Sequence, residues 1–192
     1  MRAGRRTEER VDTSLEHVEH RGAEELRAGL DEVRLSPADR GTVELIVRRP
    51  AEGEREVLDE AELDLEAGLV GDRWHSGASP NPDAQLTLMN ARAIDLIAGG
   101  KERWPLAGDQ LYVDFDLGVE SLPPGARLAV GSAVVEVTAE PHTGCAKFSE
   151  RFGSEALKLV NKPPGRELRL RGVNTRVIAP GTVRVGDTIA RV

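Results

Sequence analysis

A single cysteine lies among residues that could make it reactive. Cys145 is the only cysteine in the 192 residues, and it belongs to the run Glu140-Pro141-His142-Thr143-Gly144-Cys145-Ala146-Lys147-Phe148. This run follows an expected strand and precedes an expected helix that starts near Ser149. The thiol is therefore placed just ahead of a helix N-terminus, whose exposed N–H groups favour the thiolate. His142 could accept a proton or bind an anion. A thiolate is both a nucleophile and a soft ligand for a metal.

Lys147 adds a positive charge two residues beyond the thiol. We therefore take Cys145, His142 and Lys147 as the candidate catalytic residues, and Cys145 as the candidate metal ligand. One cysteine excludes an internal disulfide and any zinc or iron–sulfur site that needs several cysteines of one chain. The alternative is that Cys145 is a small buried apolar residue with no chemical role.

Composition and charge narrow the class of protein. Hydrophobic residues make up 39% and charged residues 31% of the chain, as is typical of a soluble globular protein. The net charge of -7 argues against a general nucleic-acid binder. No apolar run approaches the roughly 20 residues that cross a membrane. The basic N-terminus lacks the apolar region of a secretory signal, so that we expect a cytoplasmic protein.

The charges are unevenly distributed along the chain. Residues 41–72 carry three arginines and ten acidic residues, whereas residues 140–192 carry ten basic and five acidic residues. The C-terminal quarter is either an ordinary solvated surface or a patch that attracts a small anion such as a phosphate.

The apolar pattern predicts a helical arm followed by a β-rich domain. Residues 1–40 carry two narrow helical stripes, Val11, Leu15 and Val18 and then Leu26, Leu30 and Val33. From residue 41 to residue 192 the chain has the alternation and the glycine turns of short strands. Strands are expected over 42–48, 56–58, 85–89, 111–115, 127–130, 133–139, 173–178 and 182–190. Helices are expected after Asn90 and over 149–160. No βαβ pattern or glycine-rich phosphate loop is present, and the fold class is therefore mainly β, a closed or nearly closed barrel with few helices.

Four stretches of this domain resemble the MOSC domain, named for the C-terminal part of molybdenum cofactor sulfurases. They are Gly68-Leu69-Val70-Gly71-Asp72; Gln85-Leu86-Thr87-Leu88; Gly108-Asp109-Gln110-Leu111; and Gly144-Cys145-Ala146-Lys147 with Arg171-Gly172-Val173-Asn174. Their order and spacing match over about residues 41–192, and the single cysteine occupies the family's position. The chain is most similar to the small stand-alone bacterial members.

The resemblance implies a barrel like that of pyruvate kinase and binding of the molybdenum cofactor, a molybdopterin. In related reductases the matching cysteine binds molybdenum, and the substrates are small N-hydroxylated compounds. The resemblance thus implies an oxidoreductase with a small-molecule substrate and a separate redox partner protein. The alternative is a binding module that carries the cofactor, or a persulfide sulfur on Cys145, to another protein.

The candidate cofactor-binding residues are Arg171, Asn174, Asp72, Asp109 and His75. The guanidinium of Arg171 suits a pterin phosphate, or else it pairs with a surface carboxylate. Asp72 and Asp109 follow glycines in tight turns, where an aspartate commonly caps its own backbone. His75 is placed at a pocket mouth or on the ordinary surface.

Departures from the larger relatives shape the remaining expectations. The aminotransferase-like domain of full-length sulfurases does not precede this module, so that pyridoxal phosphate is not expected. The helical arm in its place is compatible with a homodimer that completes the site. Many relatives have proline before the cysteine, and Gly144 is expected to loosen this segment.

Overall fold

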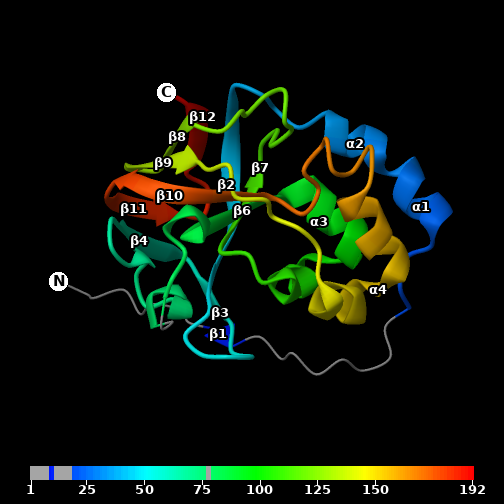
Figure 1. The fold of residues 1–192 in the computed structure, drawn as a ribbon, viewed down its shortest axis with the longest axis horizontal. Coiled ribbons are helices and arrows are strands. Elements are labelled where there is room, and N and C mark those ends of the chain that lie inside the picture. Colours follow the sequence, from blue (N-terminus) through cyan, green and yellow to red (C-terminus); the bar gives the residue numbers. More distant parts are fainter. Residues whose placement is uncertain (1–8, 11–18, 77–78) are drawn as a thin grey trace.

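Seven strands close into a barrel in the computed structural model, which describes residues 9–10, 19–76 and 79–192. In ring order they are β2 (Arg40–Arg48), β12 (Thr188–Arg191), β8 (Arg127–Val130), β9 (Ala133–Val137), β10 (Val173–Ala179), β6 (Leu86–Asn90) and β7 (Leu111–Asp114). The pairing of β7 with β2 closes the ring. The β6–β7 pair is parallel and the other neighbouring pairs in the ring are antiparallel. The prediction of a mainly β, barrel-forming chain is confirmed (Figure 1).

Five further strands lie outside this ring. β1 (Glu9–Arg10) pairs with β3 (Glu56–Leu58), which in turn pairs with β2. β11 (Gly181–Arg184), β4 (Glu60–Asp64) and β5 (Gly68–Leu69) form a second, three-stranded sheet. The sequence did not predict β4 and β5. Both are short, and the Gly68–Leu69 strand lies in what the sequence indicates as a turn.

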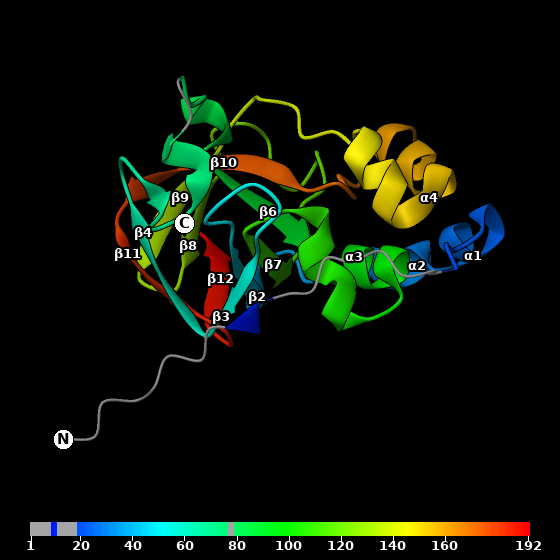
Figure 2. The same cartoon turned by 90° about the horizontal axis from the view of Figure 1, so that it is seen from below.

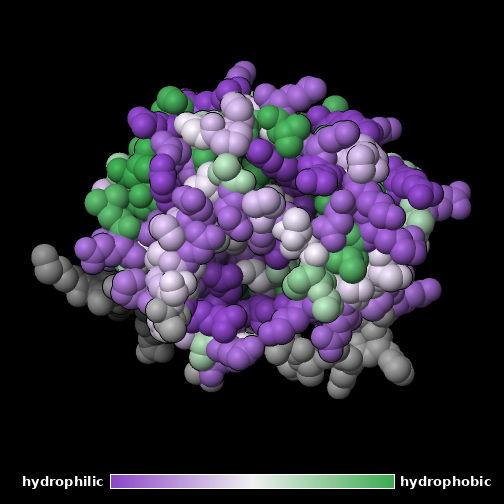
Figure 3. All heavy atoms as spheres, in the orientation of Figure 1, coloured by the Kyte–Doolittle hydropathy of each residue, from purple (hydrophilic) through white to green (hydrophobic). Residues whose placement is uncertain are grey.

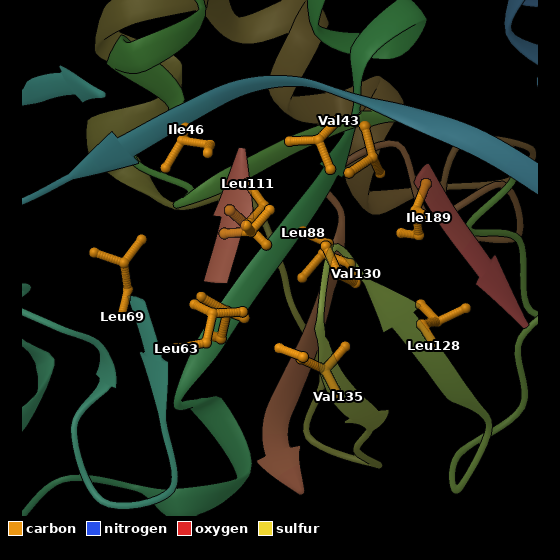
Figure 4. Close-up of a cluster of buried hydrophobic side chains, with 14 of the residues drawn as sticks. Val43, Ile46, Leu63, Leu69, Leu88, Leu111, Leu128, Val130, Val135 and Ile189 are labelled. Carbon is orange, nitrogen blue, oxygen red and sulfur yellow. The ribbon is translucent and has the colours of Figure 1, made fainter. Parts of the chain in front are cut away.

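Alternating apolar side chains fill the interior of the barrel. In β9 buried and half-buried residues alternate, as expected for a strand with one face on a core. Figure 4 shows the interior side chains, and Leu88, Leu111, Val130, Val135 and Ile189 belong to this cluster. Since the strands come from many parts of the sequence, this core joins residues from Val43 to Ile189.

A second apolar layer joins one side of the barrel to the helices. All five residues of β6 are buried, because Leu88 faces the barrel interior whereas Met89 faces the helices. Figure 2 shows this helical side. Its elements are α1 (Ala23–Ala28), α2 (Leu30–Arg34), α3 (Ala91–Ala98), the 3-10 helix η3 (Lys101–Ala107) and α4 (Ala146–Asn161), which is interrupted at Gly153 where φ is +89°. The two layers fix where α4 begins relative to the barrel.

Within the N-terminal arm, α1 and α2 pack on this helical layer, whereas Glu9–Arg10 forms strand β1 where the sequence predicted a helical arm. Leu26, Leu30 and Val33 are all buried, and Gly29 separates α1 from α2 within the stripe that they form. The earlier stripe, Val11, Leu15 and Val18, lies outside the described residues. Within the described part of the chain, no helix has the length and apolar character needed to cross a membrane.

Asn90 fixes the passage from β6 into α3. Its side-chain oxygen accepts a hydrogen bond from the N–H of Ala93 at 2.9 Å, as an N-cap does. Its amide nitrogen donates to the hydroxyl of Ser36 at 2.7 Å and to the carbonyl oxygen of Phe115 at 2.8 Å. One buried amide therefore holds α2, α3 and the end of β7 together.

We expect Asn90→Ala to lower the free energy of unfolding by about 2 to 3 kcal/mol, because a helix cap and two buried hydrogen bonds are lost. Urea unfolding measures this difference. Asn81→Ala is the matched control, since Asn81 caps an exposed 3-10 helix, η2 (Pro82–Ala84). It is expected to cost under about 1 kcal/mol. Equal losses in the two variants would contradict the role assigned to Asn90.

Candidate functional site

A buried carboxylate gathers two of the predicted site residues. Asp109 follows the left-handed turn at Gly108 (φ +87°) and is fully buried. One carboxylate oxygen lies 2.7 Å from Nε2 of His142, and the other lies 2.5 Å from Nη1 of Arg171. Arg171 also donates from Nη2 to the carbonyl oxygen of Ala107 at 3.0 Å. The carboxyl group of Asp109 thus makes contacts to residues 33 and 62 positions away, rather than capping its own turn.

The charges of this group follow from burial and from the pairing. Burial alone would raise the pKa of Asp109, but the charge of Arg171 and the hydrogen bond from His142 hold it well below its usual range. Burial and the positive charge of Arg171 lower the pKa of His142, against the opposing effect of Asp109. An ionised carboxylate can only accept hydrogen bonds, so that Nε2 of a neutral His142 carries the proton. Its Nδ1 then keeps a lone pair.

A second buried carboxylate, Asp72, holds Arg49 by a two-pronged ion pair. Nε and Nη2 of Arg49 donate to the two carboxylate oxygens at 2.9 and 2.8 Å. Nη1 of Arg49 donates to the carbonyl oxygen of Gly108 at 2.8 Å, immediately before Asp109. Asp72 also accepts the backbone N–H of Trp74 at 3.0 Å, and so it caps its own turn as well. This pair braces the turn that carries Asp109.

Two cavities share the segment 140–143 as part of their lining. This segment runs along the face of Figure 1 from the barrel towards α4. The larger cavity has about 700 Å³ and the smaller about 430 Å³. Both are lined by Glu140, Pro141, His142, Thr143 and Asn174. The surface of this face is mainly hydrophilic (Figure 3). Such volumes are typical of sites for small organic ligands.

Each cavity has its own cationic side. The larger cavity is lined by Arg49 and Arg73 together with Trp74 and Thr87. The smaller is lined by Arg166, Arg169 and Arg171, with Gly144 and Asn161 at the end nearer α4; its apolar wall consists of Val119, Pro124, Val160 and Val173. Asn174 is buried and donates from its amide to the carbonyl oxygen of Glu140 at 3.1 Å, so that it holds the shared wall in place.

Cys145 is the exposed N-cap residue of α4, and its side chain makes no capping hydrogen bond. The residues that line the two cavities include its neighbours Thr143 and Gly144 but not Cys145 itself. Lys147 is exposed and pairs with Glu52, with 3.1 Å between Nζ and the carboxylate oxygen. The positive charge of Lys147 is therefore shared with a carboxylate on the loop between β2 and β3.

The segment before the thiol is fixed by a residue that the sequence analysis did not single out. The side-chain oxygen of Asn161 accepts the N–H of Gly144 at 2.9 Å, and its amide nitrogen donates to the carbonyl oxygen of Gly144 at 3.1 Å. A Cβ at position 144 would lie 2.8 Å from side-chain atoms of both Leu157 and Val160. Gly144 therefore permits close contact with α4 rather than loosening the segment, and a proline there would lose the hydrogen bond from its N–H.

The structure brings together part of the predicted set. Asp109, His142, Arg171 and Asn174 surround the segment 140–143, and Asp72 acts on the site through Arg49. His75 is exposed beside Trp74 and is not among the residues that line the two cavities. Sequence reasoning missed Arg49, Arg73, Asn161, Arg166 and Arg169. The sequence offered two signals: the adjacent arginines 48 and 49 in an otherwise acidic stretch, and the basic excess over residues 140–192, which contains Arg166 and Arg169.

We expect Asp109→Asn to lower the free energy of unfolding by about 3 to 5 kcal/mol at pH 7, because it leaves Arg171 buried without its counterion. The depressed pKa of Asp109 means that its contribution is complete above about pH 4, the unfolded value, and declines as the pH falls through the folded pKa. The gap between wild type and variant should therefore narrow in acid.

Urea unfolding at a series of pH values measures this gap. Asp114→Asn is the control, since Asp114 pairs with Arg92 in a partly exposed position and should cost about 1 kcal/mol or less. A gap between Asp109→Asn and wild type that stays small at pH 7 would contradict the assignment.

Comparison with known proteins identifies the fold and the family of the chain. The chain is similar to the YuaD protein of Bacillus subtilis, with 19% identity, a TM-score of 0.58, and coverage of 78% of this chain and 94% of that one. It is also similar to YiiM of Escherichia coli, with 23% identity, a TM-score of 0.52, and coverage of 79% and 69%. At these identities the likeness shows a shared fold. No curated protein matches the sequence.

The sequence profile of the MOSC domain matches residues 81–190. That range contains Asp109, His142, Cys145 and Arg171, together with most of the barrel strands. At the level of the family, the domain is associated with binding of the molybdenum cofactor. The chain belongs to the MOSC domain family.

Proposed function

We propose that this protein binds the molybdenum cofactor with the sulfur of Cys145 as a ligand, and that it reduces small N-hydroxylated or related compounds. The observation that carries the proposal is the position of the thiol. It is exposed and directly follows the segment that forms the common wall of two cation-lined cavities. A soft, accessible sulfur beside space for an organic anion suits a metal that is held by a phosphorylated pterin.

The residues present fit such a group. Nε of Arg171 is buried without a hydrogen-bond partner in the described structure, although its Nη atoms are paired. Arg73 lines the larger cavity, and its guanidinium makes no hydrogen bond or ion pair with the described residues. Arginines suit phosphate and pterin oxygens because their N–H groups form a planar fork. We assign Arg73, Arg171 and Asn174 to holding the cofactor.

When bound, the cofactor supplies two-electron redox chemistry. Reduction of an N–OH group to N–H consumes two electrons and two protons and releases water, so that a separate redox protein must deliver the electrons. Neutral His142 offers the lone pair of Nδ1 to a ligand hydroxyl or N–H group, while its Nε2–H stays bound to Asp109. His142 lines both cavities and can therefore orient a ligand from either.

A second candidate function is that of a carrier for the cofactor, or for a persulfide sulfur on Cys145. One observation favours it, namely that Cys145 lies outside the residues that line the two cavities. A thiol at the surface can be reached by another protein without opening either cavity. A homodimer that covers this surface is a further proposal.

We expect the full chain from a cofactor-competent host to contain stoichiometric molybdenum and pterin, and Cys145→Ser to lose most of the molybdenum. Elemental and pterin analysis measures both. The control is Ser154→Ala, an exposed change on the same helix, which should retain the metal. Turnover of a hydroxylamine-type substrate with an electron donor identifies the enzyme, and a loaded protein without turnover identifies the carrier. Equal molybdenum in wild type and Cys145→Ser, or none in either, would refute the role of the thiol.

A further inference from the structure

The smaller cavity has a cationic wall, and the proposed function accounts for only one of its arginines, Arg171. Arg166, Arg169 and Arg171 all come from the loop between α4 and β10, and all three line this cavity of about 430 Å³. Three arginines within six residues place like charges close together. Like charges repel unless counterions lie among them, so that the net charge of this wall depends on the partners of each guanidinium.

Arg169 has no carboxylate partner in the part of the chain that the structure describes. Its Nη1 donates to the carbonyl oxygens of Leu122, at 2.6 Å, and Leu117, at 3.4 Å. The guanidinium is half-buried, and burial lowers the pKa of Arg169. Its backbone also adopts φ +47°, a left-handed conformation that is uncommon for a residue with a long side chain.

The other two arginines are also incompletely satisfied. Arg171 is balanced by Asp109 but keeps a buried Nε that has no hydrogen-bond partner among the described residues. Arg166 is exposed, and its side chain forms no hydrogen bond or ion pair within the described ranges. Among the residues that line the cavity, Glu140 is the one with a carboxylate, and it is exposed. The wall therefore carries an excess of positive charge.

We propose that the smaller cavity is a phosphate subsite, in which Arg166 and Arg169 bind the phosphate group of an organic phosphate monoester. Guanidinium groups bind phosphate oxygens in pairs of parallel hydrogen bonds. The apolar wall formed by Val119, Pro124, Val160 and Val173 gives the organic part of the ligand a surface to contact. The subsite rests on the proposed function for the origin of the phosphate group. This group belongs either to the cofactor or to a phosphorylated substrate.

The test is the binding of inorganic phosphate and pyrophosphate to the full chain without cofactor. Titration calorimetry and changes in NMR chemical shifts measure this binding. Arg169→Lys keeps the charge but removes the fork, and it should weaken binding about tenfold. Arg166→Gln removes an exposed cation and should weaken binding about threefold. The side chain of Arg166 is exposed and forms no hydrogen bond or ion pair with the described residues, so this variant is expected to fold.

Arg191→Gln is the matched control, because Arg191 is an exposed arginine of β12 that lines neither cavity. It should leave phosphate binding unchanged. The proposal is overturned if the wild type fails to bind phosphate and pyrophosphate at millimolar concentration. It is equally overturned if Arg191→Gln weakens binding as much as Arg169→Lys does.

The cofactor-loaded protein distinguishes the two origins of the phosphate. If the loaded protein no longer binds phosphate whereas the cofactor-free chain does, the subsite holds the phosphate of the cofactor. If both bind it, the subsite serves a phosphorylated substrate. Either result supports the subsite. Absence of molybdenum from the expressed protein would refute the proposed function but leave phosphate binding by the cofactor-free chain as a separate result.

Discussion

The carboxylate of Asp109 is held between Arg171, from the loop that leads into β10, and His142, from the segment that leads to Cys145. Complete burial of an ion pair gains little net stability, because desolvation offsets most of the attraction between the charges. The contribution of the ion pair is to fix the positions of the segments that it joins. It ties the turn before β7 to two regions that are far apart in the sequence, and it sets the wall between the two cavities. Removal of the carboxylate would leave a buried guanidinium without its counterion.

The barrel makes this arrangement possible by bringing distant residues to one rim. β7 begins just after Asp109 and β10 just after Arg171. Both strands flank β6, which pairs with each of them. Arg49, near the end of β2, braces the same turn through Gly108. The side chains that surround the cavities are thus attached to a closed sheet rather than to independent loops.

Much of the barrel could be predicted from the sequence because its strands alternate apolar and polar residues between glycine turns. Asn90 and Gly99 were likewise readable as the ends of α3, since capping depends on local chemistry. The short strands β4 and β5 were not predicted. The five residues of β4 alternate between exposed and buried and were overlooked, whereas β5 has two residues and begins at a glycine of a turn-rich stretch. The site could be predicted only in part. The order and spacing of the motifs pointed to Cys145, Asp109 and Arg171.

The missed residues have a common physical reason. Arg49 matters because the fold places it 2.8 Å from the Asp72 carboxylate, 23 positions away, and Asn161 because α4 returns it to Gly144, 17 positions away. Neither contact corresponds to a sequence spacing that would predict it. The position of Cys145 outside the cavity linings is also a property of the folded surface. It keeps both the enzyme and the carrier proposal physically reasonable.

The account depends most directly on the charge state of His142. Nitrogen-detected NMR titration of its imidazole in the folded protein measures both the pKa and the tautomer. We predict a pKa below the ordinary 6.5 of histidine, with the proton on Nε2 and the lone pair on Nδ1 at neutral pH. A pKa above that value, with a doubly protonated ring at pH 7, would show that the Asp109 charge is not balanced by Arg171, and it would contradict the site described above.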